Sequence, residues 1–141
     1  MKIKDVMTDQ VIFVNPDTNV EQVAQLMQKY NVGSIPVCNA DGVMGIVTDR
    51  DIVIRNVAHG TDPKTLKASD VMSTQVVTVS PSTDVRAVSK IMAEKQVRRL
   101  PVVDNNRIVG MVALGDLADS NGFFDMEASD ALTEISKPNR I

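Results

Sequence analysis

The sequence is poor in the residue types that build many functional sites. It has no tryptophan, aromatic residues make up 3% of its 141 residues, and cysteine and histidine occur once each. Cys38 alone cannot form an internal disulfide, which is expected in a reducing compartment such as the cytoplasm. One cysteine and one histidine also argue against a dedicated zinc or haem site. We therefore expect an aliphatic core, no metal centre and a cytoplasmic location.

Charge, hydropathy and motif content argue against further classes. The chain has 15 basic and 18 acidic residues, a net charge of −3, whereas nucleic-acid binders usually carry a basic excess. No apolar run approaches the ~20 residues of a membrane span, and the opening MKIKDVMT lacks the apolar centre of a secretory signal. No catalytic triad, dinucleotide or P-loop pattern appears. We expect no enzyme, and no nucleic-acid or membrane partner.

A repeat at a spacing of 65 residues organises the chain. Residues 5–52 and 70–117 align without a gap and are identical at 17 of 48 positions. Two copies indicate a duplicated unit and not a solenoid, which needs at least three repeats. We place the first repeat at 1–58, a linker at 59–68, the second repeat at 69–120 and a tail at 121–141.

Each repeat predicts the element order β-α-β-β-α, which gives an α/β (α+β) fold. Short β-branched runs bounded by turn residues predict strands, and apolar residues at i, i+3, i+4 and i+7 predict a helix. Thr18 and Glu21 fit a capping box for the first helix. The predicted strands are 11–15, 34–39 and 43–48 in the first repeat and 76–80, 100–104 and 108–113 in the second, with helices from 20, 49, 85 and 114.

Packing of the two repeats follows from the strand composition. The strands lack apolar/polar alternation, which indicates sheets covered on both faces. We expect the repeats to hide these faces against each other about a pseudo-twofold axis. In the tail, residues 123–136 predict an amphipathic helix. Its apolar stripe consists of Phe124, Ala128, Ala131, Leu132 and Ile135.

Three motifs occur in matched pairs: DVMT and DVMS, VGSIPV and VRRLPV, and GIVTDRDI and GMVALGDL. Together they resemble the cystathionine-β-synthase (CBS) domain family, and the resemblance covers residues 5–117. The pair is similar to a Bateman module, which implies a regulatory homodimer with no required cofactor. The implied effector is an adenosine-containing ligand (AMP, ADP, ATP, NAD or S-adenosylmethionine) in a cleft between the repeats.

The resemblance also implies binding residues. The family's ribose motif, Gly-apolar-x-Thr/Ser-x-x-Asp, is complete at Gly45, Thr48 and Asp51, whereas the second copy has Ala113 in place of the hydroxyl. A carboxylate can accept both ribose hydroxyls, a threonine can donate to a phosphate, and helix-start amides favour an anion. The first implied site contains Thr48, Asp51, Ser73, Val76, Thr78 and Val97. The second contains Asp116, Arg98, Arg99, Thr8, Val11, Phe13, Val32 and Ser34.

Plainer interpretations compete with these assignments. Thr48 and Asp51 also fit a helix cap, although a cap alone explains Asp116 poorly because Ala113 offers it no hydroxyl. An alternative interpretation of Arg98 and Arg99 is that they are solvated surface charges with no role in binding. The alternative function is a ligand-free module for dimerisation or for binding an unidentified protein partner. The Thr48/Ala113 difference predicts that the site with Thr48 binds nucleotide better.

Overall fold

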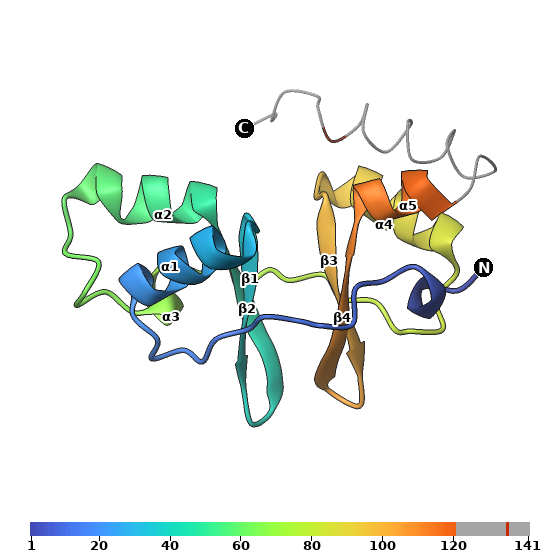
Figure 1. The fold of residues 1–141 in the computed structure, drawn as a ribbon, viewed down its shortest axis with the longest axis horizontal. Helices are drawn as coiled ribbons and strands as arrows, with labels where there is room; N and C mark the ends of the chain where they lie inside the picture. Colours follow the sequence, from blue (N-terminus) through green and yellow to red (C-terminus); the bar gives the residue numbers. More distant parts are fainter. Residues whose placement is uncertain (121–134, 136–141) are drawn as a thin grey trace. The chain divides into compact units, whose positions relative to one another are not determined.

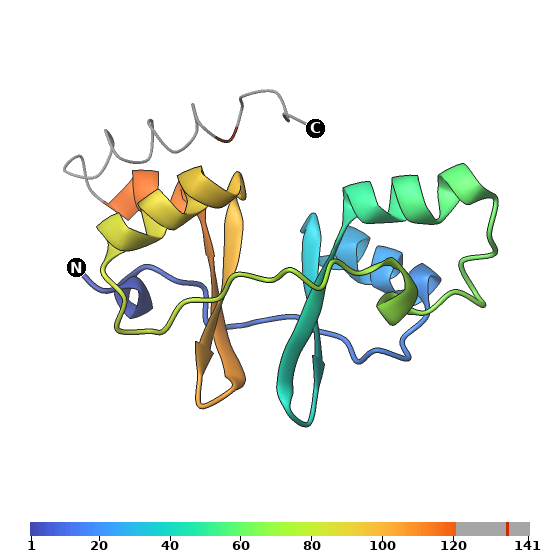
Figure 2. The same cartoon turned by 180° about the vertical axis from the view of Figure 1, so that it is seen from behind.

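The computed structural model describes residues 1–120 and 135, which fall into two compact units. Unit 2 is the continuous stretch 12–76, and unit 1 combines residues 1–11 with the chain from residue 77 onward. In each unit two helices lie on one face of an antiparallel hairpin (Figures 1 and 2). The mixed α/β class is therefore confirmed. The predicted tail helix lies outside the described residues except at Ile135.

The helices and strands repeat in the same order in both units. Unit 2 contains α1 (Val20–Tyr30), β1 (Ser34–Asn39), β2 (Gly42–Thr48), α2 (Asp49–Arg55), the 3-10 turn η2 (Val57–His59) and α3 (Ala68–Val71). Unit 1 contains the 3-10 turn η1 (Ile3–Asp5), α4 (Val85–Lys95), β3 (Arg99–Asp104), β4 (Arg107–Ala113) and α5 (Leu114–Ser120). The predicted second and third strands and the helices that start at 20, 49, 85 and 114 are confirmed.

Two-residue turns, Ala40-Asp41 and Asn105-Asn106, close the two hairpins. Asn105 and Asn106 have φ values of 52° and 65°, the left-handed pair that a type I′ turn requires. In the other hairpin the side chain of Asn39 accepts a hydrogen bond from the Asp41 amide at 2.8 Å. Each ladder is also irregular at the same matched place, next to Val37 and Val102.

The strands predicted at 11–15 and 76–80 are wrong, because each run pairs through one residue only. Val14 bridges Val37 of β1 in parallel: its amide donates to the Pro36 carbonyl at 3.0 Å, and its carbonyl accepts from the Cys38 amide at 2.8 Å. The next donors on either side would be Pro16 and Pro36, and proline has no N–H. Val79 makes the same single bridge to Val102 of β3.

The capping box predicted at Thr18 and Glu21 is also wrong. Helix α1 begins one residue later, at an Asn19 cap whose side chain accepts from the Gln22 amide at 2.9 Å. Asparagine and threonine are both good caps, so the sequence offered two adjacent choices. Thr18 instead donates its hydroxyl to Asn15 Oδ1 at 3.2 Å.

Each unit has its own aliphatic core. In unit 2, α1 buries the predicted Val20, Val23 and Met27, while Ala24, predicted on the same face, is exposed. Helix α4 buries the matched Val85, Val88 and Met92. The predicted aliphatic, methionine-containing core is therefore confirmed for the described residues.

The DVM segment of each repeat joins the hairpin of the other repeat. Thr8 pairs with Met111 of β4 through two backbone hydrogen bonds of 2.8 and 2.9 Å. Ser73 pairs with Ile46 of β2 in the same way, at 2.9 and 3.0 Å. The compact units therefore differ from the sequence repeats by an exchange of these two segments.

Candidate functional site

The start of α2 in unit 2 carries the complete copy of the predicted ribose motif. The Thr48 amide donates to Asp51 Oδ2 at 2.9 Å, and the Asp51 amide donates to Thr48 Oγ1 at 3.1 Å. These two bonds form a full capping box, and both residues are half-buried. The structure therefore gives the pair a structural role. Within the described part of the chain, Asp51 Oδ1 accepts no hydrogen bond and the Thr48 hydroxyl donates none.

The backbone amides at this helix start, which the resemblance implies favour an anion, are hydrogen-bonded within unit 2. The Asp49 amide donates to the Gly33 carbonyl at 2.9 Å, and the Arg50 amide donates to Asp49 Oδ1 at 2.8 Å. The third amide, that of Asp51, is held by Thr48. Because all three amide donors are occupied, the groups that this corner can offer to a ligand are the Thr48 hydroxyl and carboxylate oxygens, and not backbone amides.

Ser34 adds an unpaired hydroxyl to the same corner. It is the first residue of β1 and stands opposite Thr48 in the ladder. Its Oγ is buried and has no hydrogen-bond partner among the described residues. A buried polar atom left unpaired costs roughly 1–3 kcal/mol, so an oxygen of this kind is a marker of a binding position. The family resemblance implies a place for Ser34 beside Asp116, whereas its partner in the β1–β2 ladder of unit 2 is Thr48.

The start of α5 in unit 1 keeps half of the same box. The Ala113 amide donates to Asp116 Oδ2 at 2.8 Å, which matches the bond between Thr48 and Asp51. The sequence-based view that a cap explains Asp116 poorly is therefore wrong, since the carboxylate caps the helix without any hydroxyl at position 113. The amides of Gly115 and Asp116 have no partner among the described residues.

Two arginines flank this second corner. Arg99 stands opposite Ala113 in the ladder, and the Arg98 carbonyl accepts from the Leu114 amide at 2.8 Å. Both side chains are exposed, and neither forms an ion pair within the part of the chain that the structure describes. Unit 1 thus combines two cations, open amides and a carboxylate, a set that suits a phosphate better than the corner of unit 2 does.

The remaining predicted site residues divide between the units. Of the first set, Ser73 and Val76 lie in unit 2 with Thr48 and Asp51, while Thr78 and Val97 lie in unit 1. Of the second set, Thr8 and Val11 lie in unit 1 with Asp116, Arg98 and Arg99, while Phe13, Val32 and Ser34 lie in unit 2. Both predicted sets therefore combine residues of two units, and their assembly into one site stays a prediction.

The two motif glycines have a packing role. A Cβ at Gly45 would lie 2.6 Å from Met72 Sδ and 2.8 Å from the Ser73 carbonyl oxygen. At Gly110 it would lie 2.5 Å from Met7 Sδ and 3.0 Å from the Thr8 carbonyl oxygen. Each glycine therefore admits the methionine of the DVM segment that pairs with its strand.

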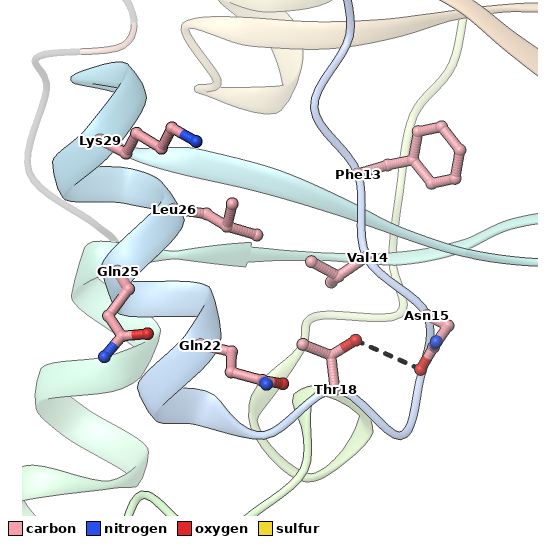
Figure 3. Close-up of a pocket in the computed structure, with 8 residues that line it drawn as sticks. All are labelled: Phe13, Val14, Asn15, Thr18, Gln22, Gln25, Leu26 and Lys29. Carbon is pink, nitrogen blue, oxygen red and sulfur yellow. Dashed lines mark hydrogen bonds between the residues drawn. The ribbon is translucent and has the colours of Figure 1, made fainter.

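A groove that the sequence analysis does not predict lies on unit 2 between α1 and the segment before it (Figure 3). Its volume is about 570 Å³. Gln22, Leu26 and Lys29 follow one another at i, i+4 and i+7 on α1, a spacing that places them on one helical face. That spacing was the available signal, but it predicts only a shared face and not a hollow beside it.

Other functional features are few in residues 1–120 and 135. No cluster of three or more potential metal-ligating side chains occurs there, and no helix there is long and apolar enough to cross a membrane. Burial raises the pKa of the Cys38 thiol above its ordinary value, which makes this cysteine a weak nucleophile.

Comparison with known proteins matches both repeats. The family model described as CBS domain matches residues 3–56 and 68–121. The CBS domain-containing protein YhcV of Bacillus subtilis is 46% identical over 137 residues, covering 97% of this chain and 96% of its own length.

Solved structures agree with these matches. The crystal structure of Hypoxic Response Protein I with two coordinated zinc ions superposes with a TM-score of 0.80 at 33% identity, covering 86% of this chain and 99% of that one. A hexameric CBS-CP12 protein from bloom-forming cyanobacteria gives a TM-score of 0.77 at 28% identity, covering 87% of this chain and 69% of that one.

Proposed function

The chain belongs to the CBS domain family as a tandem pair, and from this premise we propose that it is a regulatory module that binds an adenosine-containing ligand. The observation that carries the proposal is the buried, unpaired Ser34 hydroxyl opposite Thr48. A ligand hydroxyl at this corner would pair with Ser34 and with the free Oδ1 of Asp51. The module itself performs no catalysis in this proposal.

The two corners contribute different chemistry to ligand selection. Ser34, Thr48 and Asp51 offer hydroxyls and a carboxylate, which suit the vicinal hydroxyls of ribose. Arg99 and Asp116 offer a guanidinium and a carboxylate, so the corner of unit 1 suits a ligand that carries both phosphate and ribose. We therefore expect the two corners to differ in their preference for phosphorylated adenosine ligands.

Isothermal titration calorimetry with AMP, ADP, ATP, NAD and S-adenosylmethionine tests the proposal. Asp51→Asn keeps an oxygen for the cap and removes the charge, and it should weaken binding about 10- to 100-fold, the range for a lost charge-assisted hydrogen bond. Asp104→Asn is the matched control, because Asp104 is exposed at the end of β3. Absence of binding by all five compounds, or equal weakening by both variants, would refute it.

A second candidate function, docking to a second copy or another protein, is favoured by the outer face of α2. This helix buries no residue, and Val53, Ile54 and the following Val57 are 58%, 45% and 66% exposed. Clustered exposed aliphatic side chains mark interaction surfaces. The CBS-CP12 relative is hexameric, which makes self-association the first form to test.

Light scattering after size exclusion separates this candidate from the first. If the face of α2 is an interface, Ile54→Glu should convert an oligomer to a smaller species and leave nucleotide binding in place. A monomeric wild-type chain would contradict self-association, and a thermal-shift screen that responds to no nucleotide would favour docking over ligand binding.

A further inference from the structure

The groove between α1 and residues 13–18 of unit 2 has the composition of a small-molecule site. We propose that it binds a small organic anion with a flat apolar body. All eight lining residues lie within unit 2, so the groove exists in one compact unit. None of Ser34, Thr48 and Asp51 lines it, and Phe13 at its rim is the one lining residue shared with the implied adenosine sites.

Side chains from two segments face each other across the groove. Figure 3 shows Gln22, Leu26 and Lys29 of α1 directed toward the segment that precedes the helix, and Val14 directed back toward Leu26. The ring of Phe13 turns away from the helix at the rim. The volume of about 570 Å³ falls inside the ~300–1,000 Å³ typical of small-molecule sites.

The apolar part of the groove is firmly held. Val14 is 6% exposed, because its backbone is fixed to β1 on both sides. Leu26 is half-buried and packs against the core of unit 2. Phe13 is 55% exposed, an unusual state for a phenylalanine. A flat apolar ligand in the groove would rest against Val14 and remove the exposed part of Leu26 from water, with Phe13 at the rim.

The polar part of the groove consists of donors. Asn15 Oδ1 accepts from the Asp17 amide at 2.9 Å and from the Thr18 hydroxyl at 3.2 Å, so its orientation is set and its Nδ2 hydrogens remain available. The carboxamides of Gln22 and Gln25 form no hydrogen bond among the described residues. The side-chain amide groups of Asn15, Gln22 and Gln25 can therefore each donate a hydrogen bond to a ligand oxygen.

Lys29 supplies the charge that selects an anion. It is the one charged residue among the eight that line the groove. Its Nζ lies 5.3 Å from the ring centroid of Tyr30 and takes part in no ion pair within the described residues. The nearest acid in sequence to the lining segment, Asp17, is paired with Lys67 at 3.4 Å. A carboxylate or similar anion would find an unopposed cation here.

The second repeat shows that the fold does not require these side chains. The apolar frame is kept, since Val14 matches Val79 and Leu26 matches Ile91. The ligand-facing chemistry changes: Lys29 matches an acid, Glu94. Phe13, Gln22 and Gln25 likewise match Thr78, Ala87 and Lys90. The two copies thus share the apolar frame and differ in the placement of charge: the second has Lys90 where the first has Gln25, and Glu94 where the first has Lys29.

Three probes with one ring system and different charges test the proposal. Titration of the full chain with 2-naphthoate, 2-naphthylmethanol and 2-naphthylmethylamine is followed by two-dimensional NMR of the side-chain amide groups. We expect 2-naphthoate to shift the signals of Asn15, Gln22 and Gln25 in a saturable way, and the amine to leave them in place. Inorganic phosphate, an anion without a ring, should bind more weakly than 2-naphthoate.

Two lysine variants test the role of the positive charge. Lys29→Gln should weaken 2-naphthoate binding about two- to fivefold, a range set by the exposure of the ammonium group. Lys95→Gln, an exposed lysine at the end of α4, should leave the affinity unchanged. Asp51→Asn should also leave it unchanged, which separates this groove from the proposed adenosine site.

Specific results would overturn the proposal. They are absence of saturable shifts with 2-naphthoate, equal affinity for the naphthyl alcohol or amine, or equal loss in Lys29→Gln and Lys95→Gln. If the wild-type chain binds 2-naphthoate as expected but binds no adenosine-containing ligand, only the function proposed above is contradicted.

Discussion

Exchanging the residues at positions 48 and 113 tests whether the two helix-start corners differ by one cap bond. Thr48 Oγ1 accepts from the Asp51 amide at 3.1 Å, and Ala113 has no equivalent atom. The other bond of the box is present in both corners: the Thr48 amide donates to Asp51 Oδ2 at 2.9 Å, and the Ala113 amide donates to Asp116 Oδ2 at 2.8 Å. The variants Thr48→Ala and Ala113→Thr therefore change one hydrogen bond in opposite directions.

The expected magnitude follows from the value of a cap. Losing a threonine cap costs about 1 kcal/mol of unfolding free energy, within a range of roughly 0.5–2 kcal/mol. Thr48→Ala should lower the unfolding free energy by this amount. Ala113→Thr should raise it by the same amount, because the Asp116 amide has no partner among the described residues and could donate to the new hydroxyl. For a chain of this size, 1 kcal/mol corresponds to a shift of about 4 °C in Tm.

Urea denaturation followed by circular dichroism measures both changes. The double variant should return close to the wild-type stability, because no described hydrogen bond is shared by the two boxes. A stable Thr48→Ala protein together with a destabilised Ala113→Thr protein would refute the cap as the difference between the corners. Calorimetry on the same proteins then shows whether the hydroxyl also matters for nucleotide affinity.

Three further perturbations probe packing, coupling and reactivity. Gly45→Ala should cost about 1–3 kcal/mol by overpacking, whereas Gly115→Ala, which has nothing within 4 Å in α5, should gain up to about 1 kcal/mol; equal denaturation midpoints would contradict the packing role. Arg55→Met removes the guanidinium bonds to the carbonyls of residues 71 and 72, at 3.1 and 2.9 Å, so hydrogen exchange of the 71–73 amides should accelerate, and unchanged exchange would count against this link. Because burial raises the pKa of the Cys38 thiol, iodoacetamide should modify it more slowly near pH 8 than in the urea-unfolded chain, with the rate rising as the pH approaches the raised pKa; equal rates would contradict the shift.

Periodicity and turn chemistry were enough to predict the hairpins and the four helices that begin at residues 20, 49, 85 and 114, but not the short helix α3. The 65-residue repeat doubles every local signal, and turns such as Asn105-Asn106 leave few alternatives. The outermost strands could not be predicted in the same way. Whether Val14 extends into a ladder depends on which partner residue lies opposite it, and the prolines that limit the pairing sit on two different segments.

The candidate site was predictable in its residues but not in its bonding. The sequence identifies Thr48 and Asp51, because their spacing fits both a cap and a ribose motif. It cannot show that the Asp49 amide is bonded to the Gly33 carbonyl, because this contact joins α2 to the segment before β1. The unpaired state of Ser34 Oγ has the same origin: it reflects packing, and no local sequence pattern encodes it.

The exchange of the DVM segments sets an order in time for the growing polypeptide. Unit 2 is one uninterrupted stretch and holds all its pairing partners once residue 76 has been made. In unit 1, residues 1–11 cannot pair until β4 has been synthesised. Thr8 pairs with Met111, and about a hundred residues are added between them. Closing so long a loop is slow compared with local pairing. During synthesis, unit 2, which carries Thr48, Asp51 and the groove, can therefore fold first. Residues 1–11 join unit 1 only later, once β4 is available.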